Sequence, residues 1–214
     1  MNDLAIFIPT YKRPNALAVV AKNIEEHTAH TFAIYFGLEE DDPAGLEAAI
    51  ATGHQAIVNR YEPGYSNTIQ TLYESTEEPF FMHANDDFQF LLHWDVHPMA
   101  CFDSPQIMVV GVSERENSSL SAVSIVRRSY IEEKSGVMDL PNRVFYPYGH
   151  NYQDTEFTQT AQHRGVWAGC ETRAIDHLHP GIIGGEKDYT YQKNDESAGR
   201  DEQLFNSRKH IWGK

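Results

Sequence analysis

Residues 79–95 have the sequence PFFMHANDDFQFLLHWD, and the interpretation of the whole chain depends on this segment. Its first four residues form an apolar run that ends at turn-forming residues, as is typical of a buried strand. Asp86 and Asp87 therefore follow the carboxyl end of a strand, where ligands bind in open α/β sheets. Two adjacent carboxylates repel each other, and a hard cation such as Mg²⁺ or Mn²⁺ offsets that repulsion. The alternative is a solvated turn in which an aspartate caps a helix.

Strands and helices alternate in the chain before this segment. Apolar runs predict strands at residues 4–8, 32–38 and 55–58. Helical apolar spacing follows each run, and the helices are expected to begin at Pro14, at Asp42 as a cap, and at Ser66 as a cap. This alternation predicts an α/β fold with a mostly parallel central sheet, flanked by helices and joined by right-handed crossovers.

The regular alternation is lost after Asp87. Strands are predicted at 106–112 and 166–170, with a strand running the other way at 121–126, which makes the sheet mixed. A helix is expected to start at Asp154 or Thr155, and the HLHP sequence at 177–180 puts two histidines on one face of an extended segment. Residues 181–214 are polar, which predicts a mobile tail or a lid that orders over a ligand, with a terminal helix at 201–212.

The composition is that of a globular chain long enough for one large domain. The chain has 214 residues, of which 41% are hydrophobic, and these values exclude a disordered protein. The formal net charge of −14 opposes binding to nucleic acid or an anionic membrane unless basic residues are grouped locally. The two cysteines fit no disulfide or metal framework. With no apolar run of about 20 residues and no basic amino-terminal region, the sequence predicts a cytoplasmic protein without membrane contact.

The order of these features resembles the GT-A fold glycosyltransferases, and most of all the compact family 2-like members found in phage and bacterial genomes. The resemblance is carried by four segments, which are PTYKRP at 9–14, NDD at 85–87 with WD at 94–95, QDTE at 153–156 and HLHP at 177–180. NDD is a DXD-like variant of the family's metal-binding motif, and QD stands in the place of its E-D motif. The resemblance implies a single GT-A (Rossmann-like) domain over residues 1–180, with 181–214 as a lid or tail packed on it.

The resemblance also implies the ligands and the residues that hold them. It implies a Mn²⁺ or Mg²⁺ ion bound by Asp87 and by His179 or His177. It implies a nucleoside-diphosphate sugar as the donor, and the expected donor-binding residues are Thr10, Arg13, Glu39, Asp42, Asn67 and Asp86. Asp154 is the expected general base, and Glu156 is the alternative.

The expected activity is the transfer of a hexose or pentose to an acceptor hydroxyl with inversion at the anomeric carbon. The acceptor is a glycan, a small molecule or a modified base in phage DNA, and the oligomeric state is left open. One alternative is a metal-dependent phosphohydrolase that uses Asp86, Asp87, His177 and His179. The other is a noncatalytic module that binds a nucleotide or a carbohydrate.

Overall fold

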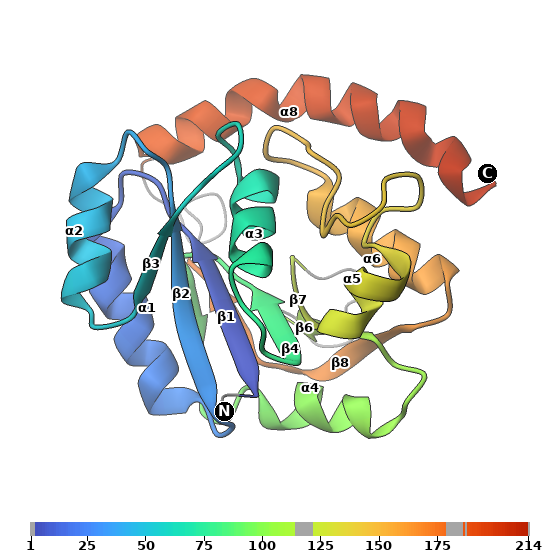
Figure 1. The fold of residues 1–214 in the computed structure, drawn as a ribbon, viewed down its shortest axis with the longest axis horizontal. Coiled ribbons are helices and arrows are strands. Elements are labelled where there is room, and N and C mark those ends of the chain that lie inside the picture. Colours follow the sequence, from blue (N-terminus) through green and yellow to red (C-terminus); the bar gives the residue numbers. More distant parts are fainter. Residues whose placement is uncertain (1–2, 114–121, 179–185, 187, 214) are drawn as a thin grey trace.

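The computed structural model describes residues 3–113, 122–178, 186 and 188–213. Seven strands form one sheet in the order β3-β2-β1-β4-β7-β6-β8 (Figure 1). They are β1 (Leu4–Pro9), β2 (Phe32–Leu38), β3 (Gln55–Val58), β4 (Phe80–His83), β6 (Val109–Ser113), β7 (Val123–Arg127) and β8 (Trp167–Arg173). A second, two-stranded sheet pairs β5 (Phe88–Phe90) with β9 (Ile175–His177).

Helices cover both faces of the seven-stranded sheet. One face carries α1 (Pro14–His27), α2 (Pro43–Ala51), α4 (Val96–Ala100) and the 3-10 helix η1 (Cys101–Asp103). The other face carries α3 (Tyr65–Glu74), α5 (Arg128–Lys134) and α6 (Gln153–His163). None of the helices among the described residues is long and apolar enough to cross a membrane.

The central strand β1 shows why the sheet is buried on both sides. Leu4, Ile6 and Ile8 belong to the core under α1 and α2. Ala5 and Phe7 belong to the core under α3 and α6. Because successive side chains of a strand point to opposite faces, a continuous apolar run fills two cores at once.

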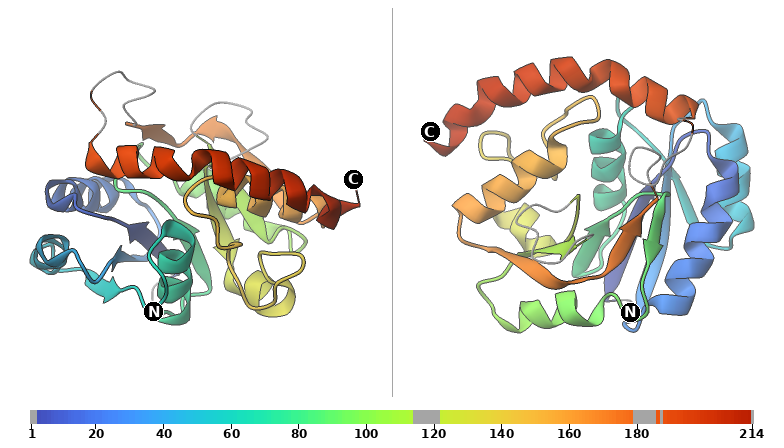
Figure 2. Two further views of the ribbon diagram at one scale, coloured as in Figure 1. Left: turned by 90° about the horizontal axis from the view of Figure 1, so that it is seen from above. Right: turned by 180° about the vertical axis from the view of Figure 1, so that it is seen from behind.

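The sheet is mixed and mostly parallel, as predicted. β1 is parallel to β2 and β4, and β2 is parallel to β3. β7 is antiparallel to both β4 and β6, whereas β8 is parallel to β6. The carboxyl ends of β1, β2 and β4 therefore lie on one edge of the sheet. The long helix α8 (Tyr189–Arg208) crosses over that edge (Figure 2).

Local predictions are confirmed where a short pattern determines the element. β2 and β3 have the predicted bounds, and Asp42 caps α2 by accepting a hydrogen bond from the backbone N–H of Gly45. Two predicted caps are wrong. α3 begins at Tyr65, so Ser66 is buried inside the helix instead of capping it. α6 begins directly after Tyr152, whose backbone is left-handed, so Asp154 lies within the first turn.

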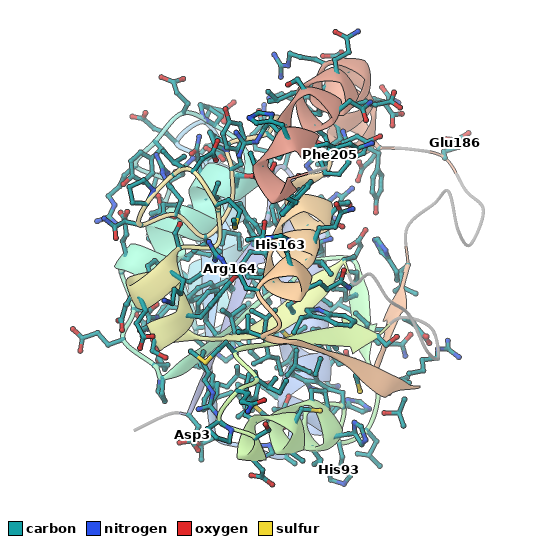
Figure 3. The ribbon with its side chains drawn as sticks, turned by 90° about the vertical axis from the view of Figure 1, so that its right-hand side faces the viewer. Asp3, His93, His163, Arg164, Glu186 and Phe205 are labelled. Carbon is teal, nitrogen blue, oxygen red and sulfur yellow. The ribbon has the colours of Figure 1, made fainter. Side chains whose placement is uncertain are left out.

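The carboxyl-terminal helix is much longer than the predicted one. It starts at Tyr189, well before the expected position 201, and the 3-10 helix η2 (Lys209–Trp212) follows it. Phe205 and Trp212 are buried with Tyr148 in a third core, and Figure 3 shows Phe205 where α8 meets α6. Trp212 Nε1 donates to Thr160 Oγ1 at 3.2 Å. A few apolar side chains thus dock a helix that is otherwise polar, which is why its periodicity is weak in the sequence.

Candidate functional site

A cleft of about 660 Å³ opens at the carboxyl-terminal edge of the sheet. The loops that follow β1, β2 and β4 line it on one side, and the first half of α8 lines it on the other. Its volume is that of a typical small-molecule site. Six of the residues predicted to bind the donor or the metal line this cleft, namely Thr10, Arg13, Glu39, Asp86, Asp87 and His177.

Asp86 connects the loop after β4 to the loop after β1. Its Oδ2 accepts from Thr10 Oγ1 at 2.7 Å, and its Oδ1 accepts from Arg13 Nη1 at 2.8 Å. Burial raises the pKa of Asp86, although the charge of Arg13 and the hydrogen bond from Thr10 act in the opposite direction. Asp86 therefore holds the guanidinium of Arg13 at the edge of the cleft.

Asp87 has an environment that suits a cation. Its Oδ2 accepts from Tyr191 Oη at 2.6 Å and lies 3.2 Å from His177 Nε2. Burial opposes its ionisation, but the hydrogen bonds from His177 and Tyr191 outweigh burial, so the pKa of Asp87 stays below its usual range. Its Oδ1 is buried and has no hydrogen-bond partner among the described residues. A buried carboxylate oxygen without a donor, next to an imidazole, fits a divalent cation.

The second sheet brings Asp87 and His177 together. β5 starts immediately after Asp87 and pairs antiparallel with β9, so that Phe88 lies opposite His177. The backbone N–H of Leu178 also donates to the carbonyl of Asp87 at 2.9 Å. Among the described residues, no group of three or more His, Cys, Asp or Glu is arranged as a complete metal site, and His179 lies outside the described part. Two protein ligands suit an ion whose coordination is completed by substrate phosphates and water.

Arg13 is shared between the sheet edge and α8. Its Nε and Nη2 donate to Asp188 at 2.8 and 3.1 Å, and its guanidinium lies 4.0 Å from the ring centre of Tyr191. The adjacent Thr190 donates its hydroxyl to the carbonyl of Tyr11 at 2.8 Å. The first turn of α8 therefore rests directly on the residues that form the cleft. No motif in the sequence points to Asp188, Thr190 or Tyr191 as residues of a site.

Of the other residues predicted to bind the donor, Glu39 lines the cleft, whereas Asp42 and Asn67 do not. The Oε1 atom of Glu39 already accepts from Gly64 N–H and Thr68 Oγ1. Asp42 is buried and accepts from the backbone N–H groups of Gly45 and Lys12, which makes it a structural cap. Asn67 donates to the carbonyl of Glu62. Neither Asp42 nor Asn67 is among the lining residues of the cleft.

The two candidate bases face different environments although they are two residues apart. Asp154 lies in the first turn of α6, is partly exposed and accepts from the backbone N–H of Thr155 at 2.8 Å. Glu156 is 1% exposed and accepts from Tyr148 Oη and from two nitrogens of Arg208. Because both oxygens of Glu156 are occupied by a buried guanidinium, it neutralises Arg208. Neither Asp154 nor Glu156 is among the residues that line the cleft.

The loop before α6 is another part of the cleft that sequence reasoning missed. Gly149, His150 and Asn151 line the cleft, and their three backbone N–H groups donate to Asp201 of α8 at 2.8–3.0 Å. These bonds hold the pKa of Asp201 below its usual range, against the opposing effect of burial. A Cβ at Gly149 would lie 2.8 Å from the Cβ of Ser197, so the close approach of loop and helix requires glycine. No local sequence pattern predicts the contact between residues 149–151 and Asp201, which are 50–52 positions apart.

Comparisons with known proteins bear on the fold. No protein-family model matches the chain, and no curated protein matches it. A solved structure of glucosyl-3-phosphoglycerate synthase from Mycobacterium tuberculosis, in complex with Mn²⁺, uridine diphosphate and glucosyl-3-phosphoglycerate, is 11% identical with a TM-score of 0.68. The match covers 99% of this chain and 80% of that one. The chain has a GT-A-like fold.

Two further structures extend this comparison. A mannosyltransferase from Pyrobaculum calidifontis, in complex with GDP-mannose and Mn²⁺, is 10% identical with a TM-score of 0.63, over 80% of this chain and 55% of that one. CMP:2-keto-3-deoxy-manno-octonic acid synthetase, complexed with CTP, is 13% identical with a TM-score of 0.57, over 94% of this chain and 99% of that one. Glycosyltransferases and a nucleotidyltransferase therefore share this arrangement of strands and helices, and similarity at such low identity concerns the fold alone.

Proposed function

We propose that the chain is a metal-dependent glycosyltransferase that moves a hexose or pentose from a nucleoside-diphosphate sugar to an acceptor hydroxyl. One observation carries the proposal: Asp87 and His177, 90 residues apart in the sequence, meet in the cleft beside a buried carboxylate oxygen that lacks a partner in the described structure. The GT-A-like fold and the neighbouring guanidinium of Arg13 support the same assignment, because both suit a nucleoside diphosphate.

The roles at the donor end follow from the contacts of each side chain. Asp87 and His177, with His179 as a further ligand, would hold Mn²⁺ or Mg²⁺, which would supply Lewis-acid neutralisation of the leaving diphosphate. Arg13 binds a phosphate through its forked donors and exchanges Asp188 for that phosphate. Asp86 keeps the guanidinium oriented during this exchange, because its bond to Nη1 is on the far side from Asp188.

The acceptor end centres on Asp154. We assign this residue as the base that removes the acceptor proton, which makes the reaction an inverting transfer. Its place in the first turn of α6 favours the ionised form, since the amino-terminal end of a helix dipole is positive. Residues two apart on a helix point about 200° apart, so Asp154 is directed away from the buried pair of Glu156 and Arg208. The net charge of −14 favours a glycan or a small molecule over a DNA base as the acceptor.

The metal-binding part of this proposal is tested by titration calorimetry. Uridine and guanosine diphosphate are titrated into the protein with Mn²⁺ and with a chelator, for the wild type, Asp87→Ala and the control Asp103→Ala. Asp103 is an exposed acid in η1, remote from the cleft lining. Binding of one diphosphate should require Mn²⁺ and be lost only in Asp87→Ala. If a diphosphate binds equally well with Mn²⁺ and with the chelator, the proposed role of the metal is wrong.

The reaction itself is tested with nucleotide sugars as substrates. Release of the nucleoside diphosphate should depend on Mn²⁺, and Asp154→Asn should lower turnover by about 10²–10⁴ while donor affinity stays close to that of the wild type. Release of phosphate from simple esters without a sugar donor would instead identify a phosphohydrolase. Donor binding without any turnover, unchanged by Asp154→Asn, would identify a noncatalytic binding module.

A further inference from the structure

The cleft contains a tyrosine hydroxyl that the protein engages only weakly. Tyr65 is the first residue of α3, and it lines the cleft. Its Oη reaches the carbonyl of Ala84 at 3.4 Å, whereas O–H···O bonds are usually about 2.7–2.8 Å long. The hydroxyl proton is therefore available to a ligand that approaches from the cleft.

The orientation of this hydroxyl is set by His83, the last residue of β4. The backbone N–H of Ser124 donates to His83 Nε2 at 3.1 Å, so the proton of the neutral imidazole is on Nδ1. Nδ1 lies 3.2 Å from Tyr65 Oη and donates to it. Burial lowers the pKa of His83 to about 3, so the imidazole stays neutral at physiological pH. Because the phenol oxygen accepts from His83, its own proton points away from that residue.

Tyr65 also stands between the two segments to which the proposed chemistry is assigned. Its hydroxyl lies at the end of β4, which leads to Asp87, and its ring meets His150 edge-on at 6.2 Å, in the loop that leads to Asp154. The ring of Phe145, 6.1 Å away, holds it from a further side. Burial, and then the charges of Asp154 and Asp87, raise the pKa of Tyr65 well above its ordinary value, so the phenol remains a hydrogen-bond donor.

We propose that Tyr65 contacts the transferred sugar of the donor, and that His83 is a positioning residue that directs the Tyr65 hydroxyl towards it. The inference rests on the proposed glycosyl transfer. In that reaction the anomeric carbon loses its bond to the diphosphate oxygen and gains a bond to the acceptor oxygen. The sugar therefore lies between the cation held by Asp87 and the base Asp154. A neutral O–H donor between two carboxylates suits a sugar oxygen, whereas the cation and the phosphates have other ligands.

The test separates the sugar from the nucleotide to which it is attached. Tyr65→Phe keeps the ring and removes the hydroxyl, and Tyr73→Phe is the matched control on the same helix, where the ring packs on Phe81 outside the cleft lining. Manganese-dependent binding of uridine or guanosine diphosphate should remain within about twofold of wild type in both variants. Turnover of the nucleotide sugar should fall roughly tenfold or more in Tyr65→Phe only, because one hydrogen bond to the sugar is lost.

The positioning role of His83 is tested by measuring the effect of its substitution on turnover with and without the Tyr65 hydroxyl. His83→Asn keeps an N–H group near the Nδ1 position and should preserve most of the turnover, whereas His83→Leu removes the donor and should match Tyr65→Phe. In the Tyr65→Phe background, His83→Leu should cause no further loss of turnover. A purely structural histidine would instead lower turnover by the same factor in both backgrounds.

The possible results distinguish this inference from the function on which it rests. If the wild type binds neither diphosphate with Mn²⁺ and turns over no nucleotide sugar, both proposals are overturned. If the wild type is active and Tyr65→Phe retains full turnover, only the role of Tyr65 is overturned. If Tyr65→Phe weakens the diphosphate and the nucleotide sugar equally, the hydroxyl contacts the nucleotide and not the sugar, which also contradicts the inference.

Discussion

The two ends of α8 contact the rest of the molecule in different ways. In its second half, the side chains of Asp201 and Arg208 are 1% and 8% exposed and satisfy groups inside the protein. In its first turn, Asp188 is 48% exposed, and it contacts Arg13, a residue of the cleft. Buried charges cannot be released without a large penalty, whereas exposed charges exchange partners easily. The helix is therefore fixed at one end, and at the other end we expect the contact between Asp188 and Arg13 to exchange when a ligand binds.

The largest expected effect is at the fixed end. Arg208→Met leaves the carboxylate of the buried Glu156 without its counter-charge. Removing one partner of a buried ion pair lowers the free energy of unfolding by about 3–5 kcal/mol, and urea denaturation followed by circular dichroism measures the loss. The control is Lys209→Met, since Lys209 is the next residue, carries the same charge and is exposed. An equal loss in the two variants would show that α8 is not anchored by this pair.

A smaller loss is expected at Asp201. Asp201→Asn keeps the shape but replaces one acceptor oxygen with an N–H₂ group that faces the N–H groups of residues 149–151. Loss of charge-assisted hydrogen bonds of this kind costs about 1.5–3 kcal/mol. Hydrogen exchange of those three amides should become faster in the variant. Unchanged protection would mean that the loop holds its position without α8.

The same carboxylate predicts how stability depends on pH. The pKa of Asp201 is lower in the folded chain than the value of about 3.9 in an unfolded chain. Between these two values the unfolded state binds more protons, so this contribution is complete above about pH 5 and is lost as the pH falls through the folded pKa. In a plot of the unfolding free energy against pH, Asp201→Asn should therefore reduce the slope below about pH 5. Identical slopes in the variant and the wild type would exclude this source of acid sensitivity.

The smallest expected effect is at the responsive end. Asp188→Asn weakens a half-exposed ion pair with Arg13, so the unfolding free energy should change by less than about 1 kcal/mol. Because Arg13 is then less strongly held by the helix, we expect the affinity for a nucleoside diphosphate with Mn²⁺ to rise about two- to fivefold. Calorimetry measures this change, with the exposed Glu202→Gln of the same helix as the control. Weaker binding would mean that Asp188 itself holds the ligand.

The contrast between the two ends also explains what could be predicted from the sequence. The strands and helices of the first half follow from short local patterns, such as the apolar run of β2 and the Asp42-Pro43 start of α2. The start of α8 was missed because its polar sequence gives no apolar stripe, and a few docked side chains such as Phe205 and Trp212 decide its place. Periodicity finds elements that bury a whole face, and it misses those held by isolated contacts.

The candidate site divides in the same way. Thr10, Arg13, Asp86 and Asp87 could be proposed to lie together because the carboxyl ends of neighbouring parallel strands share one edge. The presence of Tyr65 and Tyr191 in the site could not be predicted from the sequence, since each side chain is placed by a contact between distant segments. The different environments of Asp154 and Glu156 could not be predicted either, because Glu156 is buried by Arg208, which is 52 positions away in the sequence.

The pairing of β5 with β9 has a consequence for the order of events during synthesis and folding. It brings together Asp87 and His177, which are 90 positions apart, and such distant contacts form after the local elements on which they depend. A nascent chain that has emerged only through β7 has the Asp86-Asp87 loop and the strands around it, but no His177. The proposed cation, which needs His177, would therefore bind only after the strands that precede β9 have been synthesised, and we expect chelation to abolish the Mn²⁺-dependent binding of a nucleoside diphosphate without preventing folding.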